Sequence, residues 1–557
     1  MLELDLVSQS HLVEYNREIA RWTRLSGSPD EQHAATYAAA QLRGFGYAAQ
    51  VVTHDAYISL PGAATLRVTR PEPREVFCIT HSMGRSTGVA GVSGDLVYVG
   101  KGRPEDYARA GAAGKIALID DLATPEQAVA GTELGVAGLI FISGRHAHEM
   151  CVSPVWGNPA PSTAGTLPRI PMVSVHQEDG QRLRRLCEDG PAMVHMTADV
   201  RTGWTGTPIV IADLSPGHPD AEAEMFVLFS GHLDGWHLGA MDNGSANATM
   251  LEVARVLAPR RGGFRRGLRL ALWSGHSHGR YSSSAWYADN HWFDLADHCV
   301  AHVNIDSVGA VGADRFVTNS MPETAGLGVW AVRQVAGAEL TPKRVGRDSD
   351  QSFTGIGIPS LFGSLSHQDD GSLGWWWHTP HDTLDKIDPA RLARDAKVFA
   401  LALDRLLTDP VLPLDYTASA ADLRGRLEGL AGDAGPSFDL SPAIDAVARL
   451  EALCARVQRA AAGATGARAG AINDCLRALG RALIPATYTV AGRYAHDPAL
   501  DHTFLPRLAA ARRLGALAPD SDEARFLRVD LVRGRNAVVD AVRTACRAAE
   551  DCLASGM

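Results

Sequence analysis

The central part of the sequence predicts an α/β fold with a mostly parallel sheet. Two observations support this prediction. Between about residues 208 and 365, apolar runs of strand length alternate with segments that have helical periodicity. The strand-like runs are PIVIADL, EMFVLFSGHLD, LRLALWSG, CVAHVNIDSVG and IPSLFGS. Apolar strands alternating with helices are typical of parallel sheets covered on both faces, and such sheets bind ligands beyond the carboxyl ends of their strands.

The length of 557 residues predicts several domains, because a single hydrophobic core rarely grows so large. Residues 1–75 and 205–410 are expected to form the central α/β domain, and a helix over EQHAATYAAAQLRGFG is expected to be capped by Ser28 or Asp30. Residues 76–204 contain short apolar runs between glycines and are expected to form a β-rich insert or a small α/β one. Residues 411–557 are rich in Ala, Leu and Arg with helical period, so a helical domain follows.

Composition excludes several classes of function. The net charge of -10, without any basic run, argues against nucleic-acid binding. No apolar stretch reaches the roughly 18 residues of a membrane span, and the N-terminus has neither the basic start nor the apolar segment of a secretory signal. The eight cysteines are scattered without CxxC spacing, as in reduced proteins. We therefore expect a soluble, cytoplasmic protein.

Four polar clusters follow successive predicted strands. A single histidine after a strand is ordinarily a hydrogen-bonded structural residue, but four clusters at four strand ends favour a metal site. Imidazole and carboxylate together suit Zn, Fe, Mn or Co, and a shared carboxylate can bridge two ions. The clusters supply His232, Asp234, His237 and Asp242; His276 and His278; Asp306; and His378, His381 and Asp382.

The same segments resemble a known family. GHLDGWHLGAMDNGSANATMLEVARVL is similar to the first metal motif of the aminopeptidase Y and glutamate carboxypeptidase II (transferrin receptor-like) zinc metallopeptidases. LRLALWSG, NIDSVG and WHTPHDTLDKID resemble that family's later motifs, in the same order, and RLSGSPDEQHAATYAAAQLRGFGY resembles its N-terminal helix. The resemblance covers most of residues 15–50 and 205–400. It implies a zinc-peptidase-like (phosphorylase/hydrolase-like) catalytic domain.

The flanking segments resemble other parts of the same family. KGRPEDYARAGAAGKIALID followed by GVAGLIFISG is similar to a protease-associated domain, so the insert is expected to be protease-associated-like. The helical segment occupies the place of the family's dimerisation domain and implies a homodimer. The expected substrate is a peptide or a small amide.

The resemblance also assigns roles to individual residues. His232 matches a ligand of one metal, and Asp242 matches the carboxylate that bridges two metals. Asp306 and His378 match ligands of the other metal. Asp234 matches the acid that orients the first histidine. The implied cofactor is zinc, as one or two ions.

One loop departs from the family's pattern. Family members have two adjacent glutamates after LRLALWSG, of which the first is the general base and the second a metal ligand. This chain reads Gly275-His276-Ser277-His278-Gly279, so His276 falls at the base position and Ser277 at the ligand position. Three explanations remain open: histidines have rebuilt the site, the site runs other small-molecule chemistry with one metal or a different one, or the protein is an inactive dimeric binding protein.

We expect the rebuilt site, with His278 as a metal ligand and His276 as a base or second ligand. The replacement of carboxylates by imidazoles leaves the metal less neutralised and its water more acidic, and it makes Fe, Mn, Co or Cu alternatives to Zn. The expected activity is hydrolysis of an amide or peptide bond by metal-activated water, with a non-peptidase amidohydrolase as the alternative.

Further side chains are candidates for substrate binding or for a supporting role. Asp350 could equally serve a turn, and the tryptophans before His378 could equally be core. His237 and His381 are expected to support the site rather than to bind metal. The substrate-binding candidates are Arg280, Tyr281, Asp350 and Trp377, with Arg347 and Asp348 in the same loop as Asp350.

Overall fold

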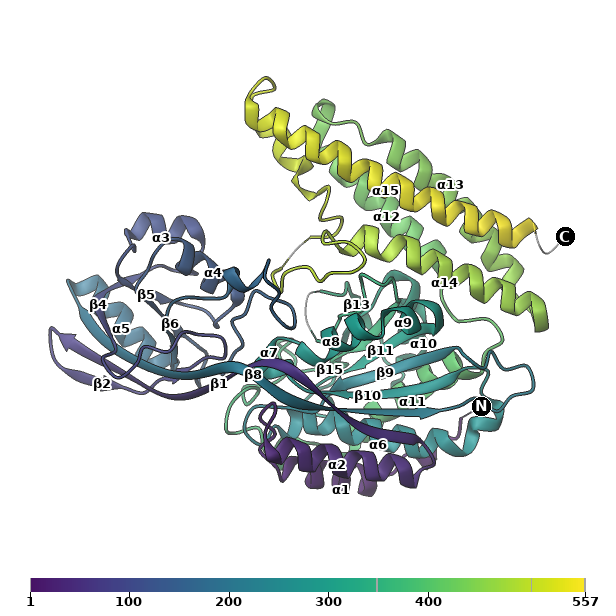
Figure 1. Ribbon diagram of the computed structural model, residues 1–557, viewed down its shortest axis with the longest axis horizontal. Helices are drawn as coiled ribbons and strands as arrows, with labels where there is room; N and C mark the ends of the chain where they lie inside the picture. The colour runs from purple at the N-terminus through teal and green to yellow at the C-terminus, as the bar shows by residue number, and fades with distance from the viewer. Residues whose placement is uncertain (1, 347–348, 502, 555–557) are drawn as a thin grey trace.

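The computed structural model describes residues 2–346, 349–501 and 503–554. The chain forms three parts: a central α/β domain, an insert that projects to one side of it, and a bundle of long helices that packs above it (Figure 1). The predicted fold class, an α/β protein with a mostly parallel central sheet and a helical C-terminal segment, is confirmed.

The central sheet has the strand order β14-β11-β9-β10-β8, with β1 paired to β8. Strands β10, β9, β11 and β14 run parallel to one another, whereas β8 is antiparallel to β10. The carboxyl ends of the four parallel strands therefore meet at one edge of the sheet. The strand bounds are β1 (Ala48–Arg70), β8 (Met193–Leu214), β9 (Phe226–His232), β10 (Gly267–Trp273), β11 (Cys299–Ile305) and β14 (Ser360–Gly363).

Helices cover both faces of this sheet, as the continuous apolar strands predicted. On β8, Val210 and Ala212 belong to the core beneath one face, and Ile209 and Ile211 belong to the core of the other. The first face packs against α1 (Gln9–Ala20), α2 (Pro29–Gly44), α6 (Ala246–Leu257), α10 (Pro322–Ala336) and α11 (Pro389–Thr408). The second face packs against α8 (Ser282–Asn290) and α9 (Trp292–His298), which follow the one-turn helix α7 (His276–Gly279). A small separate sheet contains β12 (Arg315–Asn319), β13 (Thr341–Lys343) and β15 (Ser366–His367).

Strands β1 and β8 join the central domain to the insert. They form a long antiparallel ribbon that runs from one domain into the other (Figure 1). Leu66 and Val194, at the far end of the ribbon, lie in a core of the insert, whereas Val210 lies in the central core. The boundary expected between residues 204 and 205 therefore falls inside β8, because the two domains share these strands.

The insert is α/β rather than β-rich. Its strands β4, β5, β6 and β7 run parallel, and helices connect most of them. The glycine-bounded apolar runs gave the strands correctly, but the short helices between them have weaker periodicity. The bounds are β2 (Arg74–Val76), β3 (Ile79–Thr80), β4 (Val92–Tyr98), α3 (Pro104–Ala110), β5 (Ile116–Ile119), α4 (Pro125–Glu133), β6 (Gly138–Ile142), β7 (Met172–Val175) and α5 (Gln177–Asp189).

The C-terminal segment is helical, and its helices pack on one another and on the central domain (Figure 1). Their bounds are α12 (Tyr416–Ala434), α13 (Ser441–Ala461), α14 (Gly466–Tyr488) and α15 (Asp522–Ala554). At the other end of the chain, the expected Ser28 cap is present, since its side chain accepts a hydrogen bond from the Glu31 N–H at the start of α2. Within the described residues, no helix combines the length and the apolar character needed to cross a membrane.

Candidate metal centre

The centre of the site is a buried carboxylate that lies between two imidazoles. One Asp242 carboxylate oxygen, Oδ1, lies 3.0 Å from His232 Nε2, and the other, Oδ2, lies 3.0 Å from His378 Nε2. His232 ends β9, whereas Asp242 lies in the turn before α6 and His378 lies in the loop after β15. His232 Nε2 and Asp242 Oδ1 have no hydrogen-bond partner and are buried. Such a carboxylate can bridge two cation positions, one beside each histidine.

Backbone carbonyls fix the orientation of both imidazoles. His232 Nδ1 lies 2.8 Å from the carbonyl oxygen of Asp234, and His378 Nδ1 lies 2.6 Å from that of Glu149. Because a carbonyl oxygen only accepts hydrogen bonds, each Nδ1 carries a proton and each Nε2 faces Asp242, where its lone pair could bind a metal ion. This arrangement is the one that metal-binding histidines have.

Asp306, which follows β11, lies on the His232 side of the centre. Its Oδ1 is 3.5 Å from His232 Nε2, and its carboxylate also accepts hydrogen bonds from Ser307 and Ser349. The sequence analysis had paired Asp306 with His378. The structure instead groups His232, Asp242 and Asp306, because β9 and β11 are neighbours in the sheet.

The ring of His276 lies flat on that of His232, with centroids 3.7 Å apart and an angle of 11° between the planes. Its Nδ1 is 2.8 Å from Asp350 Oδ2, and Asp350 is buried and also accepts a hydrogen bond from Ser284. A carboxylate that accepts from Nδ1–H leaves the lone pair of the His276 Nε2 free to accept a proton. Asp350 was expected to bind substrate, but the structure makes it the partner of His276.

The stacking of these two rings bears on whether His276 binds metal. Ligand atoms of His232, His276 and Asp306 lie within 4.8 Å of one another, close enough to surround one ion. An imidazole binds metal along a lone pair that lies in its ring plane, however, and the lone pairs of two parallel, stacked rings do not converge on one point. As oriented here, His276 lies beside the metal position without pointing at it, which suits a proton-transfer role.

His278 lies behind the centre rather than in it. Its Nδ1 is 2.9 Å from Ser26 Oγ and 3.8 Å from Asp234, and its ring packs on Trp236 with centroids 4.2 Å apart. Asp234 accepts hydrogen bonds from Ser26 and from the N–H groups of His276 and Ser277. The structure thus does not bring His278 into the cluster that includes Asp306. The Asp234 carboxylate holds the loop of His276, and the Asp234 carbonyl orients His232.

One supporting residue, Arg24, escaped the sequence analysis. Arg24 is wholly buried and donates hydrogen bonds to the carbonyls of Leu233, Leu238 and Gly239, the loop between His232 and Asp242. Its position at the start of RLSGSPDEQH, a segment that resembles the family's N-terminal helix, was the only signal.

The carboxylate of Asp382 accepts hydrogen bonds from the N–H groups of Met241 and Asp242. Burial and the neighbouring charge of Asp242 raise the pKa of Asp382 to about 7. Asp382 thereby holds the turn that carries the bridging carboxylate.

The donor set fits a divalent metal. Burial disfavours a charge on His232, but Asp306, Asp234 and Asp242 outweigh burial and raise the pKa of His232 well above its usual range. The cluster of buried carboxylates thus attracts a cation. Imidazole nitrogen with carboxylate oxygen suits zinc and the later first-row metals.

A cavity of about 470 Å³ opens onto this centre. Three of the residues expected to contact substrate line it: Arg280, Tyr281 and Trp377. Trp377 stacks on His378 with centroids 3.5 Å apart, and Tyr281 packs edge-on against His276 at 4.8 Å. Arg347 and Asp348 lie outside the described residues.

His237 and His381, expected to support the site, lie apart from the cluster. His237 Nε2 is 3.2 Å from Glu149 Oε2, and the ring of His381 packs on those of His146 and Trp375.

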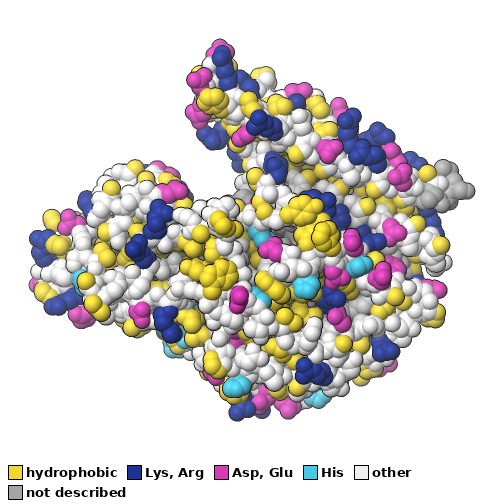
Figure 2. All heavy atoms as spheres, viewed as in Figure 1, with side chains coloured by type: hydrophobic (Ala, Val, Ile, Leu, Met, Phe, Trp, Pro, Cys, Tyr) yellow, Lys and Arg dark blue, Asp and Glu magenta, His cyan; other side chains and the backbone are white. Residues whose placement is uncertain are grey.

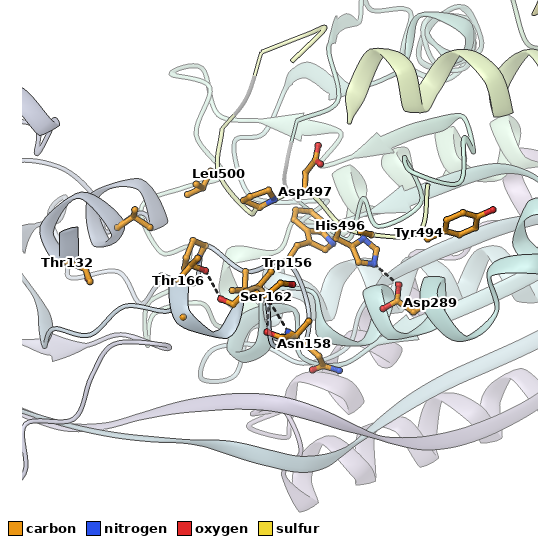
Figure 3. A pocket seen from close by; sticks show the side chains of 18 of the residues that line it. Thr132, Trp156, Asn158, Ser162, Thr166, Asp289, Tyr494, His496, Asp497 and Leu500 are labelled. Atoms are coloured by element: carbon orange, nitrogen blue, oxygen red, sulfur yellow. Dashed lines mark hydrogen bonds and ion pairs between the residues drawn. The ribbon is translucent and has the colours of Figure 1, made fainter. Parts of the chain in front are cut away.

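A larger cavity of about 870 Å³ lies where the insert, helices α8 and α9, and residues 494–500 meet (Figure 3). On the space-filling surface, apolar side chains gather in this middle region (Figure 2). Trp156 lines this cavity and packs on Tyr281. The other side of Tyr281 packs on His276, so Tyr281 lies between Trp156 and His276. No group of metal-ligating side chains was found here among the described residues, so the smaller cavity carries the chemistry.

Residues 210–403, which contain the whole centre, match peptidase family M28. The chain carries an M28 peptidase domain. The resemblance stated from the four motifs is thereby confirmed, and so is the prediction of an enzyme of the peptidase class.

The similarity to curated relatives extends beyond this domain. The chain is 26% identical to the probable glutamate carboxypeptidase VP8 of Zea mays over 74% of its own length and 69% of the relative's. It is 24% identical to the aminopeptidase YwaD of Bacillus subtilis over 68% of its length and 80% of the relative's.

Solved structures have a fold similar to that of this chain. The aminopeptidase from Aneurinibacillus sp. strain AM-1 is 22% identical, with a TM-score of 0.57 over 72% of this chain and 95% of that one. BSAP, a zinc aminopeptidase from Bacillus subtilis, gives a TM-score of 0.56 at 22% identity, over 72% of this chain and 96% of that one.

Replacement of Arg24 by alanine is expected to lower both stability and metal content. The substitution leaves buried carbonyls of the 233–239 loop without donors, which costs about 3 kcal/mol in total. Thermal unfolding and elemental analysis of Arg24→Ala measure the two effects. Arg21→Ala is the control, because the Arg21 side chain is 57% exposed and bonds only Glu18 nearby. An unchanged unfolding temperature and metal content in Arg24→Ala would show that the 233–239 loop does not depend on Arg24.

Proposed function

We propose that this protein is a metal-dependent hydrolase that cleaves a peptide or amide bond, with zinc as its metal. The carrying observation is the buried Asp242 carboxylate, each oxygen of which faces the Nε2 of a histidine whose Nδ1 is fixed by a carbonyl. The match to peptidase family M28 supports peptide hydrolysis. The similarity to BSAP, which is named a zinc aminopeptidase, supports the choice of metal.

A bound zinc ion supplies Lewis acidity that lowers the pKa of water and polarises the scissile carbonyl. His232, Asp242 and Asp306 would hold it, and His378 lies on the other side of the Asp242 carboxylate. Their imidazoles are already oriented, so little reorganisation is needed on binding.

The proton transfers belong to His276. Its Nε2 accepts a proton from the attacking water and returns it to the leaving amine, the task that a carboxylate performs in other family members. Asp350 keeps Nδ1 protonated and stabilises the imidazolium that forms. The cavity beside His276 leaves room for a substrate.

The proposed activity predicts hydrolysis that depends on metal. Purified protein should contain zinc, hydrolyse members of a peptide panel, lose activity with 1,10-phenanthroline and regain it with added zinc. The panel should contain N-acylated peptides, free peptides and aminoacyl anilides, and we expect the anilides to be poor substrates because the usual carboxylate base is absent. Protein that contains zinc but cleaves no member of the panel would contradict peptide hydrolysis.

The proposed proton transfer predicts a loss of kcat without a loss of metal. His276→Gln should lower kcat by about 10²–10⁴-fold, and Asp350→Asn by about 10–100-fold, with KM and zinc content close to wild type. His291→Gln is the control, because its ring stacks on Tyr287 and it does not line the cavity. Loss of zinc in His276→Gln would instead make His276 a ligand.

We also propose the homodimer and the cytoplasmic location expected from the sequence. On α15, Phe526, Val529 and Val532 are 73%, 50% and 38% exposed, and their spacing of three residues places them near one another. Analytical ultracentrifugation at micromolar concentration should show a dimer that Phe526→Asp weakens. Phe293→Asp, on the equally exposed Phe293 of α9, should leave the dimer intact. A wild-type monomer would refute the assembly.

A further inference from the structure

We infer that this site binds one metal ion tightly, between His232 and Asp306, and that the second position, beside His378, lacks the ligands to hold an ion comparably. The inference rests on the proposed metal site and concerns how many ions it holds.

The first position is well supplied with donors. His232 Nε2 has Asp242 Oδ1 at 3.0 Å and Asp306 Oδ1 at 3.5 Å, so one nitrogen and two carboxylates converge. His232 is 1% and Asp242 is 4% exposed, and the facing atoms His232 Nε2 and Asp242 Oδ1 have no hydrogen-bond partner. Three protein ligands with an open fourth place are the usual set of a catalytic zinc ion.

The second position has fewer donors. His378 Nε2 faces Asp242 Oδ2 at 3.0 Å, and this is the only carboxylate in ion-pair contact with His378 among the described residues. One imidazole and one shared oxygen are too few for tight binding.

Ser277 accounts for the missing ligand. It lines the cavity together with His378 and Asp242, and its hydroxyl is buried without a hydrogen-bond partner. A neutral hydroxyl is a weak ligand for zinc, whose oxygen ligands in proteins are carboxylates. The Ser277 backbone N–H donates to Asp234, which fixes the position of the backbone at this residue.

Charge balance leads to the same result. Asp242 and Asp306 together neutralise one divalent ion. A second divalent ion would place two further positive charges in a buried site that has no additional carboxylate among the residues lining the described cavity. Asp382 does not compensate, because its oxygens are engaged by backbone N–H groups.

The experiment compares metal stoichiometry in wild type and in Ser277→Glu, with Ser277→Gln as the control of the same size without the charge. After exhaustive dialysis, we expect elemental analysis to find about one zinc ion per chain in wild type and in Ser277→Gln, and about two in Ser277→Glu. Calorimetric titration of metal-free wild type with zinc should show a second site that is at least about 100-fold weaker.

The electronic coupling of cobalt-substituted protein gives a readout that does not depend on activity. Two ions about 3.5–4 Å apart couple magnetically, so the spectrum of uncoupled cobalt is expected for wild type and coupling for Ser277→Glu. Two tight equivalents in wild type would overturn the inference while leaving the proposed hydrolase intact. A Ser277→Glu protein that is folded but still binds one ion would also overturn it. Absence of any bound zinc would refute the proposed function itself.

Discussion

The site depends on one constraint: Asp242 must remain ionised while it is buried between two imidazoles. Two oxygens facing two Nε2 atoms fix the separation of His232 and His378, which lie 146 positions apart in the sequence. Burial alone would favour the protonated acid, but the neighbouring imidazoles of His232 and His378 outweigh it and hold the pKa of Asp242 well below its usual range. The other residues of the centre hold these three side chains in position.

The insert takes part in this constraint. Glu149, which follows β6 in the insert, accepts from His378 Nδ1 through its carbonyl and donates its own N–H to the His378 carbonyl. His378 has a left-handed backbone (φ 56°), which non-glycine residues adopt only when contacts hold them there. The ribbon of β1 and β8 fixes the insert against the central sheet, and so the orientation of one histidine depends on a domain that contributes no metal ligand.

The sequence predicted the fold and the convergence of the central residues because both follow from local patterns. Strand-length apolar runs specify the sheet, and parallel strands bring their carboxyl ends together, so His232 and Asp306 meet. The partners of His276 and His278 were not predictable, because one-turn α7 and the loop containing Asp350 have no periodicity. The resemblance also paired Asp306 with His378, whereas the structure places Asp306 beside His232 because β9 and β11 are adjacent in the sheet.

The contact between His276 and Asp350 also explains how the site can lack the adjacent glutamates of its relatives. This region still contains a carboxylate, that of Asp350. The Asp350 carboxylate is buried against the Nδ1 of His276, and the imidazole lies between Asp350 and the cavity. The negative charge is therefore displaced by one side chain from the reacting position. Such an arrangement retains a proton acceptor at the cavity but removes an anionic ligand from the metal, so base and ligand are separated here into different chemical groups. Loss of the second glutamate has no equivalent replacement, since His278 bonds Ser26 and Ser277 offers only a hydroxyl.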